Sequence, residues 1–103
     1  MQSVIIKGDD IHILDRRSKA TKEGNDPTLF ISADRVLFEQ GDGVHRELLC
    51  VDSGHIKRLS MTTTGADISF EWKSRKELIV ARIPMEAVEL LTPMTAKKKK
   101  RCL

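Results

Sequence analysis

Short runs of alternating apolar and polar residues follow one another between residues 28 and 83, and each run ends at a glycine or a polar turn. The clearest is the run 67–73, in which Ile68, Phe70 and Trp72 alternate with polar residues. A period of two is typical of a strand with one buried and one wet face. Five or more such strands followed by a short helix predict a mainly β domain, built as a small antiparallel barrel or sandwich.

Turn residues divide the pattern into separate strands. Gly41, Asp42 and Gly43 stand between two β-rich runs, where the positive φ angles of a tight hairpin favour glycine and aspartate. We expect strands over residues 4–6, 11–14, 29–32, 36–39, 46–51, 56–61, 67–73 and 78–83. We expect the alternating apolar residues of the last two strands to form the core between two sheets, namely Ile68, Phe70, Trp72, Ile79, Ala81 and Ile83.

Two segments lie outside the strand pattern. Residues 15–27 are polar throughout and end in turn residues, which predicts a long, exposed and mobile loop. At the other end, Pro84 fits the first position of a helix that presents Met85, Val88 and Leu91 on one face and ends at Thr92. We therefore expect one domain over residues 1–92 and a disordered polybasic tail over 93–103.

Charge is unevenly distributed along the 103 residues. The formal net charge is +3, but five of the 18 basic residues lie consecutively at positions 97–101, which leaves 13 basic against 15 acidic residues in the rest of the chain. The body is thus slightly acidic, and a broad basic face for nucleic acid is not predicted.

The two cysteines and the N-terminus bear on the compartment. Cys50 lies in an apolar run and Cys102 next to the C-terminal residue, so we expect no bridge between them and no disulfide framework of the secreted kind. The N-terminal residues lack the apolar stretch of a signal peptide, and no run reaches membrane-spanning length. These features predict an intracellular protein, cytoplasmic or nuclear.

The order of elements resembles the PH-like superfold, as found in GRAM domains, GLUE domains and the N-terminal domain of a core TFIIH subunit. The residues T-L-F-I-S-A-D-R-V-L-F at 28–38 are similar to the hairpin of that family, and Ile56-Lys57-Arg58 to its following strand. The segment 78–91 stands where the family has its last strand and its helix. The resemblance implies a seven-stranded bent barrel without cofactor or enzymatic activity, which binds phosphoinositides, ubiquitin-like partners or acidic peptides in different members.

A competing resemblance leads to a truncated cyclic-nucleotide-binding jelly roll. The segment F-E-Q-G-D at 38–42, the run 49–56 and Ile83-Pro84-Met85 are similar to parts of that fold. Residues 65–76 lack room for the glycine-glutamate helix start and the arginine that hold the cyclic phosphate. This alternative therefore concerns the fold, without the ligand.

Two groups of cations are candidate anion-binding or partner-binding residues. The first is in the 15–27 loop and comprises Arg16, Arg17, Lys19 and Lys22. Four cations on one loop can surround a phosphate, although a solvated loop is also commonly charged. The second is the tail run Lys97, Lys98, Lys99, Lys100 and Arg101, which fits an anionic membrane, a nucleic-acid backbone, a nuclear targeting signal or a plain solubilising tail.

Catalytic and metal-binding chemistry have no clear carrier in the sequence. His12, His45, His55 and Cys50 do not show the spacing of a metal site, and no nucleophile or phosphate-loop motif is present. We therefore expect no enzyme and no cofactor, but a non-enzymatic interaction or adaptor module that binds a protein partner. The alternatives are an anionic lipid or phosphoinositide bound by the loop and the tail, and a nucleic acid bound by the tail. A homodimer formed by pairing of strand edges is also compatible with the pattern.

Overall fold

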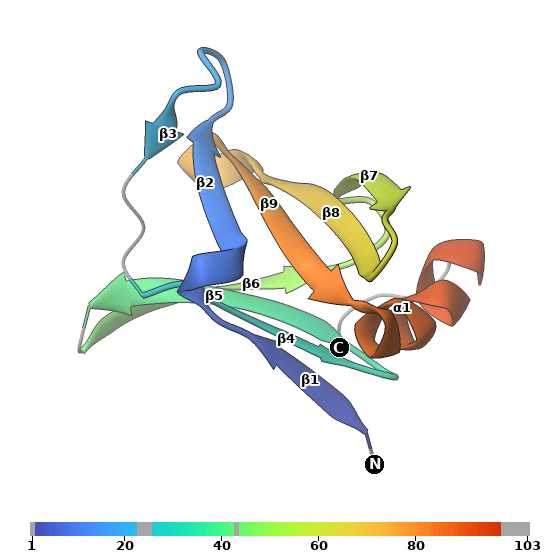
Figure 1. Ribbon diagram of the computed structural model, residues 1–103. Coiled ribbons are helices and arrows are strands. Elements are labelled where there is room, and N and C mark those ends of the chain that lie inside the picture. Colours follow the sequence, from blue (N-terminus) through green and yellow to red (C-terminus); the bar gives the residue numbers. More distant parts are fainter. Residues whose placement is uncertain (1, 23–25, 43, 98–103) are drawn as a thin grey trace.

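The structure is a computed structural model that describes residues 2–22, 26–42 and 44–97, without the side chains of Asp42 and of residues 92–97. Its described part is mainly β, with two antiparallel sheets and one C-terminal helix (Figure 1). The sheets pack face to face as a small sandwich, which confirms the fold class predicted from the alternating pattern.

The first sheet, here sheet A, has the strand order β1-β4-β5-β6. Its strands are β1 (Ser3–Ile6), β4 (Thr28–Ser32), β5 (Val36–Asp42) and β6 (His45–Val51). The last three form a meander, and β1 pairs with β4 at one edge, with Ile5 opposite Phe30.

The second sheet, here sheet B, has the order β3-β2-β9-β8-β7. Its strands are β2 (Ile11–Asp15), β3 (Thr21–Lys22), β7 (Ile56–Met61), β8 (Gly65–Trp72) and β9 (Glu77–Pro84). The strands β7, β8 and β9 form a second meander, to which β2 adds along β9.

The N-terminal segment 3–15 belongs to both sheets. It pairs with β4 as β1, turns through the short 3₁₀ helix η1 (Gly8–Asp10), and then pairs with β9 as β2. In Figure 1 this blue segment passes from the lower sheet to the upper one. One bent strand thus joins the two meanders along one side of the sandwich.

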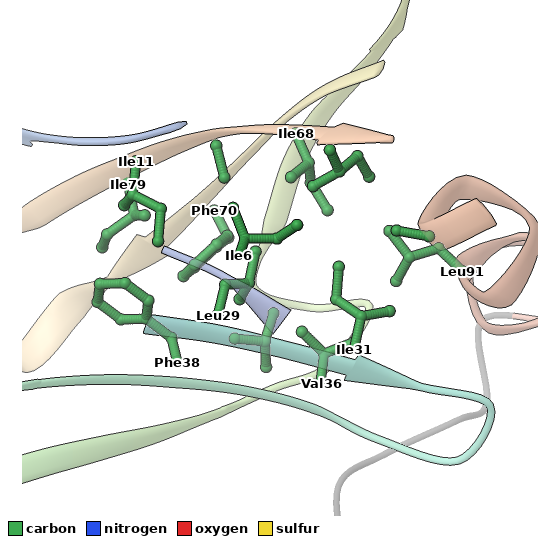
Figure 2. Close-up of a cluster of buried hydrophobic side chains, with 14 of the residues drawn as sticks. Ile6, Ile11, Leu29, Ile31, Val36, Phe38, Ile68, Phe70, Ile79 and Leu91 are labelled. Atoms are coloured by element: carbon green, nitrogen blue, oxygen red, sulfur yellow. The ribbon is translucent and has the colours of Figure 1, made fainter. Parts of the chain in front are cut away.

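The core lies between the two sheets, because the inward-facing positions of both are apolar. Phe38 of sheet A packs edge-on against Phe70 and Trp72 of sheet B, with ring centroids 5.4 and 5.8 Å apart. Figure 2 shows side chains from both sheets meeting in this layer. The six core residues predicted from the last two strands are all buried, which confirms that prediction: Ile68, Phe70, Trp72, Ile79, Ala81 and Ile83.

The helix α1 (Met85–Lys97) covers one end of the sandwich, where it contacts β1, β4, β8 and β9. Leu91 points into the core (Figure 2), and Ala87 and Val88 are also buried. Met85 is 40% exposed, so the predicted helix face was wrong at that position. The buried face is instead formed by Ala87, Val88 and Leu91.

Both predicted helix ends were also wrong. Pro84 is the last residue of β9, where it pairs with Gly65, because the proline φ is compatible with a strand end. The helix then continues through Pro93 to Lys97. A proline inside a helix removes one backbone hydrogen bond, but its φ angle is close to the helical value. Residues 98–103 lie outside the described part of the chain.

Gly65 is required where β8 pairs with the end of β9. A Cβ atom at this position would lie 1.9 Å from the carbonyl oxygen of Ile83, so any other residue would push the two strands apart. Thr62 closes the preceding turn, since its Oγ1 accepts a hydrogen bond from the Gly65 N–H at 3.1 Å.

Candidate functional site

The segment after β2 is a short hairpin for as far as it is described, and the predicted structureless loop was wrong for residues 15–22. Asp15 Oδ1 accepts hydrogen bonds from the backbone N–H groups of Arg17 and Ser18, each at 2.9 Å. These backbone hydrogen bonds hold the pKa of Asp15 below its usual value. Thr21 and Lys22 then pair with β2 as β3. A polar turn of this kind has no apolar period, so the sequence pattern did not reveal it.

Two of the four predicted hairpin cations are engaged by carboxylates of sheet B. Arg16 Nη1 lies 3.1 Å from Glu71 Oε2, and Lys22 Nζ lies 3.0 Å from Glu77 Oε2. Lys57 also approaches Glu71, at 3.5 Å. Burial opposes ionisation of Glu71, but the hydrogen bond from Arg16 and the charge of Lys57 outweigh it and lower its pKa. These ion pairs connect the hairpin to sheet B of the sandwich.

The other two hairpin cations, Arg17 and Lys19, are exposed. Lys19 Nζ donates a hydrogen bond to the backbone carbonyl of Arg16 at 3.0 Å, and its backbone adopts a positive φ of 64°. The structure therefore brings Arg16 and Lys22 to internal carboxylates and leaves Arg17 and Lys19 at the surface. It does not present the four cations together as one unneutralised cluster.

Glu77 is the most deeply buried carboxylate of this region, with 2% of the residue exposed. Besides Lys22, it accepts hydrogen bonds from Gln40 Nε2 at 2.8 Å and from Arg75 Nε at 3.1 Å. Burial acts to raise the pKa of Glu77, but the hydrogen bonds from Lys22 and Arg75 outweigh it and hold the pKa below its ordinary value. Gln40, Arg75 and Glu77 did not appear among the predicted site residues.

Arg75 also contacts Glu47 and stacks 5.4 Å above the centre of the Trp72 ring. Together these residues surround an open hollow of about 720 Å³, lined by Lys22, Glu47, Leu48, Trp72, Ser74, Arg75 and Glu77. Its two cations are matched by two carboxylates. The hollow therefore has no net charge that would select an anion.

An apolar row crosses the outer face of sheet A, the face turned away from the core. The strand register places Ile5 opposite Phe30, Phe30 opposite Leu37, and Leu37 opposite Cys50. Ile5 is 55% exposed, and Phe30, Leu37 and Cys50 are partly exposed. This row crosses all four strands. The next row holds Thr28, Glu39 and Leu48, and Glu39 forms an ion pair with Arg46 at 3.4 Å.

A hollow of about 530 Å³ adjoins the row at the β4–β5 turn. Phe30 and Leu37 supply its apolar wall, and Ser3, Ser32, Asp34 and Arg35 supply its polar lining. The turn is held by Ser32, whose Oγ lies 2.7 Å from Asp34 Oδ1. An apolar floor with charged groups at its margin is the composition of a protein-binding surface.

The outer face of sheet B differs, because polar residues interrupt every row. His12 lies opposite Val80, which lies opposite Ser69. In the next row Asp67 lies opposite Arg82, and the two side chains form an ion pair at 3.8 Å. Leu14 and Leu78 form an opposed, partly exposed apolar pair on sheet B, but Thr21 and Glu71 lie on either side of them. The apolar row of sheet A, by contrast, crosses all four strands of its sheet.

The sequence contains an indication of the apolar row that a search for alternating apolar and polar residues does not detect. Residues 29–31 and 36–38 are uninterrupted apolar triplets, whereas residues 66–70 alternate. A strand that is apolar at consecutive positions has two apolar faces. The triplets therefore indicated a second apolar face on sheet A, as the apolar run 78–81 did for Leu78 and Val80 of sheet B.

The remaining sequence-based candidates are not brought together. Within the described part of the chain no group of three His, Cys, Asp or Glu residues is placed to hold a metal ion. Cys50 is disulfide-bonded, which contradicts the expectation that this cysteine takes no part in a bridge with Cys102. Cys102 lies outside the described residues, as do Lys98, Lys99, Lys100 and Arg101, and of Lys97 only the backbone is described.

Neither protein-family models, nor curated proteins, nor solved structures provide a match to this chain. The one α-helix in the described residues is too short to span a membrane.

Proposed function

We propose that this chain is a non-enzymatic interaction module that binds a protein partner on the outer face of sheet A. The observation that carries the proposal is the apolar row formed by Ile5, Phe30 and Leu37. An antiparallel sheet with one wet face normally alternates apolar and polar residues, because exposed apolar side chains gain nothing from water. Contiguous apolar side chains on an exposed face mark an interaction site.

The surroundings of the row support a protein as the ligand. The adjoining hollow has Asp34 and Arg35 at its margin, so a partner meets an apolar centre and a charged rim. Arginine and aromatic side chains such as Arg35 and Phe30 are also the types that contribute most to binding at protein interfaces. The fitting partner is a segment that presents apolar side chains over the row and polar groups to the rim.

The connectivity supports the resemblance to the PH-like superfold. Counted as one bent strand, residues 3–15 join β4, β5, β6, β7, β8 and β9 to make seven strands, followed by α1. Only the two-residue strand β3 falls outside this order. We propose on this basis that the chain is a PH-like module, which fits a binding function without a cofactor.

Anionic-lipid binding through the hairpin is the weaker candidate. Arg16 and Lys22 already neutralise Glu71 and Glu77, so an anion would compete with buried carboxylates for them. Lipid or nucleic-acid binding would then depend mainly on Arg17, Lys19 and the cations of residues 97–101. No described contact favours either ligand.

Site-specific photo-cross-linking tests the proposed face. We would replace Leu37 by a photoreactive phenylalanine analogue and, as a matched control, replace Val80 of sheet B, which is also partly exposed. Adducts formed in extracts of the source cells would be identified by mass spectrometry, and each complex would be re-formed with the purified partner.

The proposal predicts a specific adduct from position 37 with a protein that also binds the unmodified chain when purified. Equal adducts from positions 37 and 80, or a captured protein that does not bind when purified, would contradict it. An adduct of twice the chain mass of 11.6 kDa identifies a second copy and would also count against a separate partner.

A further inference from the structure

The four sheet edges of the sandwich are not protected in the same way. An edge strand exposes unpaired backbone N–H and C=O groups, and proteins usually prevent further pairing with charges, bulges or very short strands. The edge β6 carries His45, Arg46 and Glu47. The edge β3 has two residues, one of which is Lys22.

The third edge, β7, carries Lys57 and Arg58 and has a register shift between Ile56 and Arg58 that interrupts its pairing. The fourth edge, β1, has the sequence Ser-Val-Ile-Ile, without charge, proline or bulge. It pairs on one side with β4 and is the outermost strand of sheet A (Figure 1). Among the described edges, β1 alone lacks a charge, a proline and a bulge; it is four residues long, and α1 and β9 contact it.

The open side of β1 is accessible. A groove of about 570 Å³ follows the strand from Val4 to Lys7 and is bounded by residues 82–84, Thr64 and Glu86. Ile5 is 55% exposed within the strand. An added strand would thus meet free backbone groups and an apolar side chain.

We propose that β1 pairs in antiparallel fashion with β1 of a second copy of this chain, about a twofold axis at Ile5. In this register Ile5 lies opposite Ile5 of the second copy, and Val4 lies opposite Ile6. Opposed residues in an antiparallel pair point to the same face. Outer residues therefore meet outer residues, and inner residues meet inner residues.

The register explains why a second copy fits this edge. Lys7 lies opposite Ser3 of the other copy, so the pairing opposes no like charges. The apolar row of each sheet ends at Ile5, and the pairing joins the two rows into one that continues across both molecules. Every molecule presents the same self-complementary edge, as a twofold interface requires.

The pairing is expected to be weak. A stable interface buries about 800 Å² on each partner, and a four-residue edge covers less than that. The dimer should therefore form at high protein concentration and dissociate on dilution. This inference goes beyond the proposed function, because it concerns the edge of sheet A and is measured on the isolated protein.

Sedimentation equilibrium of the full chain, from about 5 to about 500 µM, tests the pairing over the range in which so small an interface associates. The wild type should shift from monomer toward dimer as its concentration rises. Ile5→Lys places two like charges opposite each other at the twofold axis, so this variant should remain monomeric at every concentration. Leu48→Lys, at a residue 56% exposed on the opposite edge of the same sheet, should dimerise like the wild type.

A cross-link provides a readout that does not depend on charge. Opposed Cα atoms lie about 4.5–5.5 Å apart, a distance that a disulfide spans. Oxidised Ile5→Cys protein should therefore give a dimer joined through position 5 in peptide maps, whereas Lys7→Cys should not. A wild type that stays monomeric at the highest concentration would overturn the inference. The inference would also be overturned if folded Ile5→Lys dimerised, or if Leu48→Lys lost dimerisation as fully as Ile5→Lys. Cross-linking of Lys7→Cys equal to that of Ile5→Cys would overturn it as well.

Discussion

At the scale of single residues, Glu77 connects the hairpin to both sheets. Its carboxylate receives Lys22 from β3, Gln40 from β5 and Arg75 from the β8–β9 turn. Removing one member of a buried polar network leaves the others without partners, which costs more than the same bond contributes at the surface. Lys22 and Gln40 lie 55 and 37 residues away in the sequence, so no local pattern indicated them, whereas Arg75 is two residues away.

We predict that Glu77→Gln lowers the free energy of unfolding by about 1–3 kcal/mol at neutral pH, because Lys22 and Arg75 lose their charged acceptor. Glu47→Gln is the matched control. It removes an exposed contact of the same Arg75 and should cost less than about 1 kcal/mol. Chemical denaturation measures both variants, and equal losses would contradict the structural role of Glu77.

The stability difference between the wild type and Glu77→Gln should also depend on pH. Because the folded pKa of Glu77 lies below the ordinary value of about 4.3, its contribution is complete above that value and is lost as the pH falls through the folded pKa. The difference in stability between wild type and Glu77→Gln should thus be constant above about pH 5.5 and shrink below about pH 4. A difference that grew on acidification would contradict this assignment.

At the scale of elements, the hairpin after β2 is held at its turn by Asp15. The Arg16 N–H also donates to the Lys76 carbonyl at 3.0 Å, which ties this turn to the β8–β9 turn. These backbone hydrogen bonds replace the mobile loop that the polar sequence suggested. The hairpin is therefore part of the fold in the free protein.

Amide hydrogen exchange should detect this ordering. We predict protection at Asp15, Arg16 and Lys19, whose N–H groups donate to backbone carbonyls. Asp15→Ala removes the acceptor of the Arg17 and Ser18 N–H groups and should speed exchange across the turn, with little effect on the core. Asp9→Ala, at an exposed residue of η1, is the control. Rapid exchange of Arg16 in the wild type would contradict the hairpin.

The strands were predictable from sequence where a period of two recurs between turns. The core strand β8 and its partner β9 followed from this pattern, because one face of each must be buried. The sharing of residues 3–15 between two sheets was not predictable, since tertiary pairing and not local sequence decides where a strand bends. The two-residue strand β3 has too few positions to show any period.

The candidate site was less predictable than the fold. Sequence reasoning selected cations, and two of those in the hairpin are used to neutralise buried carboxylates. The apolar row of sheet A depends on which residues lie side by side in neighbouring strands, such as Phe30 and Leu37. That register is a property of the folded sheet, although the apolar triplets that build it are visible in the sequence.

At the scale of the whole molecule, the two sheets share one core but present different outer faces. Sheet B is polar outside and carries the hairpin and the ion pairs of Glu71 and Glu77. Sheet A carries the apolar row from Ile5 to Leu37 on its outer face and ends at the edge strand β1. We propose that sheet A is the binding side of the domain and sheet B the solvated side.

The most direct test is the dissociation constant of the purified partner for three forms of the chain: wild type, Leu37→Lys and Val80→Lys. Both variants place a charge on a partly exposed strand residue, with Leu37 on sheet A and Val80 on sheet B. Melting curves would first confirm that both are folded. We predict at least a tenfold loss of affinity, about 1.4 kcal/mol, for Leu37→Lys and no more than about a twofold change for Val80→Lys. Equal effects, or a larger loss for Val80→Lys, would contradict it.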